Sequence, residues 1–339
     1  MKLGSSTPAN GFWQGRRVFV TGATGMVGVW LVHDLLDAGA TVIALSRDPN
    51  AAAGAERLGK HPQLSLVRGS VEDFGRLEAI VRESAAESVF HLAGQSIIGV
   101  AQRQPLETFE ANLRGAYQLL EACRRNSATV KRVVIASSDK AYGQQQQLPY
   151  TEEMWLQGQH PYEVSKSCAD LIAQAYFHTY GLPVAIARCS NIFGGGDLNW
   201  SRIVPCTIRS LLRHERPVIR SDVKFVRDYI YVRDVSRSYL RTAEGLDDPA
   251  VRGQAFNFSL ERPVTVLELV DLLQRLMGCE HLEPEVQNAV SGEIRAQYLS
   301  AAKAHRVLGW SSSYSLEEGL AETISWYREY FAKHPAPAI

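Results

Sequence analysis

A tyrosine and a lysine four residues apart, Tyr162 and Lys166, have the types and the spacing for proton transfer. At this spacing both side chains lie on one face of a helix, and Pro161 suits the first turn of that helix. Because an ammonium beside a phenol favours the phenolate, we expect Lys166 to lower the pKa of Tyr162 from its ordinary value of ~10. The phenolate would then accept a proton from an alcohol. The alternative is a Tyr/Lys pair on a solvent-exposed helix face.

A second polar group, Ser138, Asp139 and Lys140, follows the apolar run at 132–136, which reads as a buried strand. In a parallel sheet ligands bind at the carboxyl ends of the strands. There Ser138 would hydrogen-bond the same substrate oxygen as Tyr162, while Asp139 and Lys140 place an acid and an amine beside it. The alternative is an ordinary polar loop between a strand and a helix.

A glycine-rich run, TGATGMVG at 21–28, lies between a predicted strand and a predicted helix. Gly22 permits a tight turn, Gly25 lets the backbone approach a pyrophosphate, and Gly28 allows close helix packing, while the helix N-terminus offers free N–H groups to the anion. A tight turn without a ligand is the alternative, and no Gly-Lys-Ser/Thr follows, which excludes a P-loop. The expected dinucleotide contacts here are Gly22, Thr24, Gly25, Met26, Val27 and Gly28.

The end of the second strand bears on the choice between NAD and NADP. An acidic residue there holds the ribose 2′-hydroxyl, whereas an arginine accommodates a 2′-phosphate. Ser46 stands at the usual acidic position and Arg47 follows, which favours NADP, although Asp48 and a solvent-facing Arg47 leave NAD open. Further cofactor contacts are expected after the third and fourth strands, at Ser70, Val71, Leu92, Ala93 and Gly94.

The elements that position these residues alternate between strands and helices in the first half of the chain. Strands are predicted at 17–21, 41–45, 64–67, 88–92, 132–136 and 184–187, and helices at 26–38, 71–84, 106–125 and 161–180. This order predicts a doubly wound parallel (Rossmann) sheet. A polar, Ala-rich link follows the second strand, and 191–197 is predicted to be a loop. Residues 1–187 form the expected dinucleotide lobe and 188–339 a smaller mixed α/β substrate lobe, with 229–243 and 255–258 returning to the first.

Composition excludes several classes of protein. The 339 residues include 36 basic and 36 acidic ones, which argues against a globally basic nucleic-acid-binding surface. No run approaches the ~20 apolar residues of a membrane span, and the N-terminus has no secretory pattern. Five cysteines without a CxxC indicate reduced thiols in a cytoplasmic protein. The nine histidines show no ligand spacing, so no metal is expected, and no Gly-x-Ser-x-Gly indicates a hydrolase.

Together the three motifs resemble the extended short-chain dehydrogenase/reductase family that acts on nucleotide-diphosphate sugars. The resemblance extends over nearly the whole chain, through HLAG at 91–94, NLRG at 112–115, RDYIYV at 227–232 and LGW at 308–310. Within this family the opening at 12–22, the Ser138-Asp139-Lys140 triplet and the run at 191–197 are most similar to CDP-glucose 4,6-dehydratases. The segment between Tyr142 and Pro161 is shorter than in those enzymes, and 225–232 has the general epimerase/dehydratase pattern.

The resemblance implies an enzyme with a tightly bound NAD or NADP. Tyr162 would take the proton of the sugar O4, Lys166 would set the pKa of Tyr162 and bind the nicotinamide ribose, and Ser138 would steady O4. Asp139 would protonate the departing C6 hydroxyl. Lys140 stands where related enzymes have a glutamate base, and it would act either as the base or by orienting Asp139 or polarising the keto oxygen.

The resemblance also implies how the substrate is bound and how the chain assembles. Arg227, and more weakly Arg202 and Arg295, would hold the diphosphate, and Asn191 would contact the sugar or its phosphate. The helices at 106–125 and 161–180 would pair into a homodimer. A nucleotide-sugar 4-epimerase or another oxidoreductase of the superfamily is the nearest alternative, and a non-catalytic dinucleotide sensor is the alternative of another class.

Overall fold

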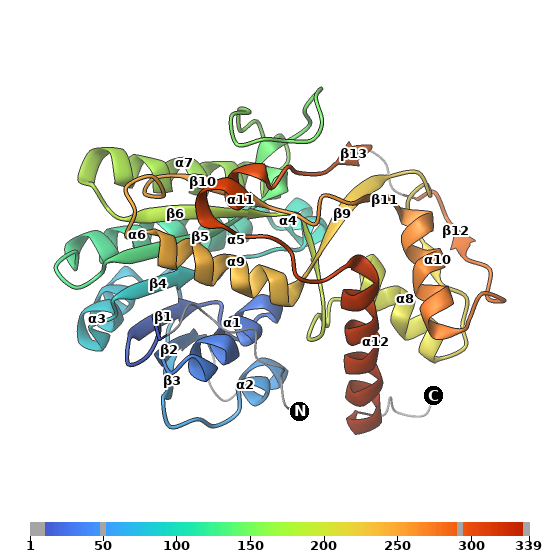
Figure 1. Ribbon diagram of the computed structural model, residues 1–339, viewed down its shortest axis with the longest axis horizontal. Coiled ribbons are helices and arrows are strands. Elements are labelled where there is room, and N and C mark those ends of the chain that lie inside the picture. Colours follow the sequence, from blue (N-terminus) through green and yellow to red (C-terminus); the bar gives the residue numbers. More distant parts are fainter. Residues whose placement is uncertain (1–10, 48–51, 290–293, 335–339) are drawn as a thin grey trace.

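The computed structural model describes residues 11–47, 52–289 and 294–334 (Figure 1). Its centre is a parallel seven-stranded sheet in the order β10-β6-β5-β4-β1-β2-β3. The predicted doubly wound sheet is therefore confirmed. Its strands are β1 (Arg17–Thr21), β2 (Thr41–Ser46), β3 (Leu64–Arg68), β4 (Ser88–His91), β5 (Arg132–Ser138), β6 (Val184–Cys189) and β10 (Ala255–Phe258).

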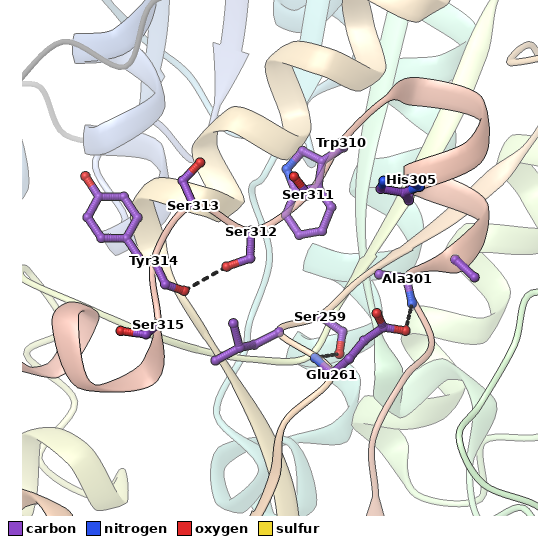
Figure 2. Close-up of a pocket in the computed structure, with 12 residues that line it drawn as sticks. Ser259, Glu261, Ala301, His305, Trp310, Ser311, Ser312, Ser313, Tyr314 and Ser315 are labelled. Atoms are coloured by element: carbon purple, nitrogen blue, oxygen red, sulfur yellow. Dashed lines mark hydrogen bonds between the residues drawn. The ribbon is translucent and has the colours of Figure 1, made fainter.

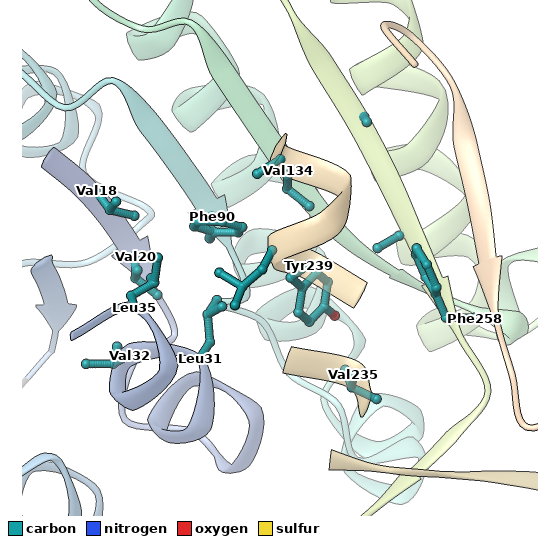
Figure 3. Packing of buried hydrophobic residues seen from close by; sticks show 14 of the residues in the cluster. Val18, Val20, Leu31, Val32, Leu35, Phe90, Val134, Val235, Tyr239 and Phe258 are labelled. Atoms are coloured by element: carbon teal, nitrogen blue, oxygen red, sulfur yellow. The ribbon is translucent and has the colours of Figure 1, made fainter. Parts of the chain in front are cut away.

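Hydrophobic layers cover both faces of this sheet because successive strand residues point to opposite sides. In β1, Val18 and Val20 belong to one buried cluster and Phe19 to the other. Figure 3 shows the first layer, where the strand residues pack against helices α1 and α9. The helices on this side are α1 (Met26–Asp37), α9 (Val232–Gly245) and α11 (Ala302–Leu308); those on the other are α3 (Phe74–Ser84), α6 (Gly115–Arg125) and α7 (Pro161–Tyr180).

A second, smaller sheet is built around β9 (Val226–Tyr231). It pairs with β7 (Asn191–Phe193) and β13 (Ala296–Gln297) in parallel and with β11 (Pro263–Thr265) antiparallel. A two-stranded ribbon, β8 (Val218–Ile219) with β12 (Glu285–Val286), lies apart from it. The helices around this region are α8 (Ile203–Leu212), α10 (Val266–Met277) and α12 (Leu316–Lys333), seen on the right of Figure 1.

Two helices differ from the predicted ones. The predicted helix at 106–125 is divided into α5 (Pro105–Phe109), a π-helical turn (Glu110–Arg114) and α6, with the short α4 (Ile98–Arg103) before them. Residues 71–84 become a helix only at Phe74, because the Asp73 carboxylate accepts from the Arg76 N–H at 3.0 Å and caps the first turn there.

Other boundaries also needed correction. The Ala-rich link contains a helix, α2 (Ala52–Leu58), and the predicted loop at 191–197 begins with strand β7 because Asn191–Phe193 pairs with β9. Strand β5 continues to Ser138 and β6 to Cys189, beyond their predicted ends. Sequence periodicity underestimates such ends because the last residues of a strand are polar site residues.

The chain returns to the large sheet after entering the small one. Helix α9 packs against the first hydrophobic layer, and β10 pairs with β6. The prediction for 229–243 was wrong for 229–231, because these residues belong to β9 and pair with β7 in the small sheet. The division into lobes at 187/188 stays a prediction. Among the described residues, no helix has the length and apolar character to cross a membrane.

Candidate active site

The glycine-rich loop between β1 and α1 forms a close-fitting backbone cradle. Gly22 has φ +70°, and a Cβ there would lie 2.5 Å from the Ala93 nitrogen. At Gly28 a Cβ would collide with the Gly22 carbonyl and lie 2.7 Å from the Ala23 Cα. No side chain caps the N-terminus of α1. An uncapped helix start with room for backbone approach suits a pyrophosphate, so the residues present fit a dinucleotide.

The other predicted cofactor residues surround this loop along the same sheet edge. Ser46 is buried at the end of β2, and Arg47 after it is exposed; Asp48 lies outside the described residues. Ser70 accepts from the Glu72 N–H at 3.3 Å. Val71 is buried against Gly115, where a Cβ would lie 2.7 Å from the Val71 Cγ2. Only the backbone of Val71 can therefore face a ligand.

The segment 92–94 lies directly against the glycine-rich loop. Leu92 N donates to the Thr21 carbonyl at 3.1 Å, and Ala93 N to the Thr21 hydroxyl at 3.3 Å. That hydroxyl also lies 2.8 Å from Nδ1 of His91, whose pKa is lowered to about 3 by complete burial and by the nearby charge of Lys166. Neutral His91 thus fixes the ends of β1 and β4 beside one another.

Tyr162 and Lys166 occupy the first two turns of α7, and both are enclosed. Burial raises the pKa of Tyr162 to about 12, although a hydrogen bond with Ser138 acts in the opposite direction. Burial also lowers the pKa of Lys166 to about 8, and its Nζ donates to the Ala136 carbonyl at 2.9 Å. The sequence predicts that Lys166 lowers the pKa of Tyr162, whereas burial raises it, because desolvation of the phenol outweighs the opposing effects of Ser138 and Arg202.

Ser138, Asp139 and Lys140 form a polar cluster where β5 ends in a 3₁₀ turn (Asp139–Tyr142). Asp139 is buried, and Ser138 and Lys140 are half-buried. The Ser138 hydroxyl donates to Asp139 Oδ1 at 2.9 Å and accepts from the Lys140 N–H at 3.2 Å. Lys140 Nζ lies 3.3 Å from Asp139 Oδ2. Ser138 and Asp139 are also close enough to Tyr162 to act on its pKa, which Ser138 lowers and Asp139 raises. An acid, an amine, a hydroxyl and a phenol thus share one enclosed space.

Gln297 completes this cluster and is a residue that the sequence motifs did not include. Its amide carbonyl accepts from Lys140 Nζ, and its Nε2 donates to the backbone carbonyl of Asp139 at 2.9 Å. Gln297 belongs to β13, far along the chain, and it is fully buried. No local pattern signals it, because its role depends on the pairing of β13 with β9.

Asn112 is a second residue whose position the sequence did not reveal. It lies in the π-helical turn, and its Nδ2 donates to the Ser165 hydroxyl and to the Gln95 carbonyl, each at 2.9 Å. Its Oδ1 accepts from the Gln95 N–H at 2.6 Å and lies close to Gly94. The π turn therefore links α7 to the predicted cofactor loop, a frequent role for such turns at functional sites.

A buried ion pair is hydrogen-bonded to the 3₁₀ turn (Asp139–Tyr142). Arg188 donates twice to Asp170, at 2.8 and 2.9 Å, and once to the Tyr142 hydroxyl at 2.7 Å. The Tyr142 hydroxyl donates in turn to Asn257 Oδ1 at 2.8 Å. Strands β6 and β10 and helix α7 are thereby tied to the last residue of the 3₁₀ turn.

The predicted substrate residues have different surroundings. Arg202 donates to Asp197 at 3.0 Å and to the Ser96 hydroxyl at 3.0 Å, and its charge reaches Tyr162. Arg227 is buried, with its guanidinium 5.5 Å from the Phe225 ring and donating to the Val226 carbonyl at 2.9 Å. Asn191 donates to the Asp228 carbonyl at 3.3 Å.

Arg295 is the most exposed of the three arginines predicted to hold the diphosphate, and its assignment stays a prediction. Its side chain is exposed, whereas its backbone carbonyl accepts from the Val226 N–H at 2.9 Å. Its main-chain hydrogen bond helps to seat β13 beside β9. Of the three predicted arginines, Arg227 is buried, Arg202 is half-buried and Arg295 is exposed.

A separate cavity of about 600 Å³ lies between the 259–261 segment and the 310–315 segment (Figure 2). None of the residues predicted for the site lines it. Ser259 on its wall donates to the buried Asp228 carboxylate, whose pKa is raised to about 6 mainly by burial. The cavity is thus adjacent to β9, and it is distinct from the cluster around Tyr162.

The arrangement around Tyr162 can move protons to and from a bound alcohol next to a dinucleotide cradle. Tyr162 and Ser138 offer two hydroxyls to one substrate oxygen, and Asp139 and Lys140 offer an acid and an amine. Within the described residues no group of three His, Cys, Asp or Glu side chains is arranged to hold a metal ion. All five cysteines are free thiols.

Comparison with known proteins gives a consistent family. A family model described as GDP-mannose 4,6 dehydratase matches residues 19–323. CDP-glucose 4,6-dehydratase from Salmonella typhimurium is 31% identical, over 94% of this chain and 92% of that protein.

Two solved structures share both fold and sequence similarity with this chain. UDP-glucose 4-epimerase from Thermotoga maritima, with UDP-glucose, has a TM-score of 0.85 at 29% identity and covers 93% of this chain and 99% of its own. dTDP-glucose 4,6-dehydratase from Streptomyces venezuelae, with NAD and TYD bound, has a TM-score of 0.83 at 28% identity and covers 94% and 98%. The motif-based resemblance is confirmed: the chain belongs to the GDP-mannose 4,6 dehydratase family, within the extended short-chain dehydrogenases/reductases that include nucleotide-sugar 4,6-dehydratases and 4-epimerases.

Proposed function

We propose that the protein is a nucleotide-sugar 4,6-dehydratase that converts CDP-glucose to CDP-4-keto-6-deoxyglucose. The observation that carries the proposal is the Ser138-Asp139-Lys140 cluster beside Tyr162. A 4-epimerase needs the hydroxyl and the phenol, but it has no leaving hydroxyl to protonate. The similarity to the Salmonella CDP-glucose 4,6-dehydratase supports the choice of nucleotide and sugar.

In this proposal the residues of the cluster divide the proton transfers among themselves. Tyr162 takes the O4 proton with Ser138 steadying the oxygen, while Lys166 below it supplies positive charge. The glycine-rich loop and the Tyr162/Lys166 pair would hold a nicotinamide cofactor, which would supply reversible acceptance of the hydride that moves from C4 to C6, with a proton returned to C5. Asp139 donates a proton to the departing C6 hydroxyl, so that water leaves as the C5 proton is lost.

The C5 proton needs an acceptor, and Lys140 is the basic group nearest to Asp139. A lysine acts as a base only in its neutral form. Lys140 is largely enclosed, with a side chain 12% exposed, and enclosure disfavours the ammonium. Asp139 at 3.3 Å acts in the opposite direction. We therefore propose Lys140 as the base, with the orientation of Asp139 as its second role.

The cofactor is proposed to be held by the glycine-rich loop, the 92–94 segment and the Tyr162/Lys166 pair. Buried Ser46 and exposed Arg47 at the end of β2 favour NADP, whereas the Streptomyces venezuelae relative has NAD bound. Because the hydride returns to the product, the cofactor should remain bound through turnover. Denaturing the purified protein and identifying the released dinucleotide decides between NAD and NADP.

The second sheet and its helices are proposed as the nucleotide-sugar lobe. Arg227 and Arg202 would neutralise the diphosphate, and Asn191 would contact the sugar side. A homodimer is proposed through α5, α6 and α7, where Leu106, Tyr117, Leu171 and Tyr180 expose large apolar surface. A monomeric mass by light scattering at micromolar concentration would overturn the dimer.

One incubation tests the activity. With CDP-glucose in deuterated water, we expect a 4-keto-6-deoxy product that carries deuterium at C5. CDP-galactose without deoxygenation would instead establish a 4-epimerase, the second candidate, which the likeness to the Thermotoga maritima enzyme supports. Bound dinucleotide without turnover of CDP-, dTDP-, UDP- or GDP-glucose would establish a sensor.

A further inference from the structure

Gln297 reaches the catalytic turn from a distant part of the chain. In β13 it is the partner of Arg227 in β9, and the following residues are tied to the 143–160 loop through the Tyr150 N–H, which donates to the Tyr298 carbonyl at 2.9 Å. This double attachment leaves the Gln297 amide in one place, against the Asp139–Lys140 pair. None of the proton transfers proposed above uses it.

We propose that Gln297 is the positioning residue of Lys140: its amide bridges the Lys140 ammonium or amine and the Asp139 backbone, and it sets the direction and the protonation of Lys140. The proposal rests on the proposed function only for its catalytic consequence. Both halves of the amide are engaged, the carbonyl by Lys140 Nζ and the Nε2 by the Asp139 carbonyl. The Gln297 side chain is completely buried, so water does not replace either contact.

The neutrality of the amide distinguishes it from the alternatives at this position. A carboxylate would hold Lys140 equally well, but it would stabilise the ammonium and keep the lysine from acting as a base. An apolar side chain would leave Nζ with one fewer acceptor. The titratable groups that interact electrostatically with Asp139 of this pair are Tyr150, Tyr162, Cys189 and Asp228, and Arg227 is the strand partner of Gln297 in β9.

The experiment measures the titration of Lys140 directly. Competitive labelling with acetic anhydride over a series of pH values, read on the Lys140 peptide by mass spectrometry, is applied to the wild type, Gln297→Glu and Gln297→Met. Gln274→Met is the matched control: Gln274 is also a buried glutamine whose amide donates to main-chain carbonyls, of Cys279 and Leu282, but it lies on α10.

For Gln297→Glu we expect labelling of Lys140 near neutral pH to fall by about tenfold, as for a lysine that gains a carboxylate within hydrogen-bond distance. For Gln297→Met we expect the titration to move to lower pH, and for Gln274→Met no change. Wild-type titration of Lys140 in both Gln297 variants would overturn the proposal.

A second measurement separates this inference from the proposed function. With CDP-glucose, Gln297→Met should lower C5 deuterium incorporation by about ten- to a hundredfold, while reduction of the bound cofactor by substrate stays near the wild-type rate. Equal loss of both steps would indicate a merely structural role and would overturn the inference. If the wild type turns over no nucleotide sugar, the proposed function fails, and the labelling result still decides whether Gln297 controls Lys140.

Discussion

The carboxyl edge of the seven-stranded sheet and the small sheet around β9 are assembled in different ways. At the large sheet each site residue follows its own strand: Gly22 follows β1, and Ser138 ends β5. In the small sheet, β9 lies among segments from 191–193, 263–265 and 296–297. The first edge is built from consecutive strand–helix units, and the second from segments that meet only in the folded chain.

In the proposed function, this difference separates the residues of the reaction from those that bind the substrate. Tyr162, Lys166 and the Ser138–Lys140 cluster are held by backbone elements that the local sequence specifies. Arg227 and Gln297 depend on the pairing of β13 with β9, and Arg202 depends on its contacts with Asp197 and Ser96. We therefore expect substitutions at the first edge to abolish reaction steps or the cofactor fit, and substitutions of the arginines in the second region to change substrate affinity. Gln297 is the exception, because it contacts Asp139 and Lys140 of the first edge.

The largest expected effect is that of Tyr162→Phe. Removing the phenol oxygen removes the proton acceptor for O4, so kcat should fall by about a thousandfold, within the range for general acid–base groups. Tyr176→Phe is the control on the same helix, since its hydroxyl contacts Glu121 at 3.3 Å, away from the cluster. Turnover is measured under saturating CDP-glucose. A Tyr162→Phe enzyme that keeps a tenth of the wild-type activity would contradict the expected role of Tyr162 in the reaction.

His91 should give the large edge a characteristic acid sensitivity. Its pKa in the folded protein is about 3 against 6.5 ordinarily, so below pH 6.5 the unfolded chain binds a proton that the folded one does not. Its contribution to stability is complete above that pH and is lost as the pH falls towards 3. Between about pH 6.5 and pH 4 the loss amounts to about 3 kcal/mol.

Denaturant unfolding across this range should therefore show a shallower acid loss for His91→Asn than for the wild type. Asp34 and Asp228, whose pKa values are raised to about 6 chiefly by burial, act in the opposite direction in both proteins. The difference between the two proteins isolates His91. Parallel pH profiles would contradict the prediction.

Gly28→Ala tests the cradle itself. Its Cβ would meet backbone atoms of the glycine loop, which cannot move aside as a flexible side chain can. We expect a loss of about 1–3 kcal/mol in the free energy of unfolding and a lower content of retained dinucleotide. Gly75→Ala, at an open position in α3, should be neutral or stabilising by about 0.5–1 kcal/mol. Wild-type cofactor content in Gly28→Ala would mean that the pyrophosphate lies elsewhere.

Arg227→Met should have the smallest effect of the four, and it should appear in KM. Loss of one diphosphate contact is expected to raise KM for CDP-glucose about tenfold, or about 1.4 kcal/mol, with cofactor content unchanged. Initial-rate kinetics measure it. An unchanged KM would indicate that Arg202, and not Arg227, binds the diphosphate.

The same division explains what the sequence predicted and what it did not. Helix α7 was predicted to the residue because a proline begins it and Gly181 ends it in the left-handed conformation. The π turn at Asn112 was missed because one extra residue per turn hardly disturbs an apolar pattern. Gln297 was missed because no motif surrounds it, and its contact with the Asp139 carbonyl depends on the pairing of β13 with β9. The tyrosine pKa was expected to fall because spacing alone does not report burial.

The repeated passage of the chain between the two sheets has an evolutionary consequence. After β6 the backbone enters the small sheet, returns as α9 and β10, leaves again for β11 and α10, and comes back with α11 before ending in α12. A single recombination point cannot exchange one half for that of a relative without severing β10 from β6. New substrate preferences in this architecture should therefore arise by point substitutions within an unbroken gene, and an engineer who wants a hybrid enzyme must join the pieces at several places.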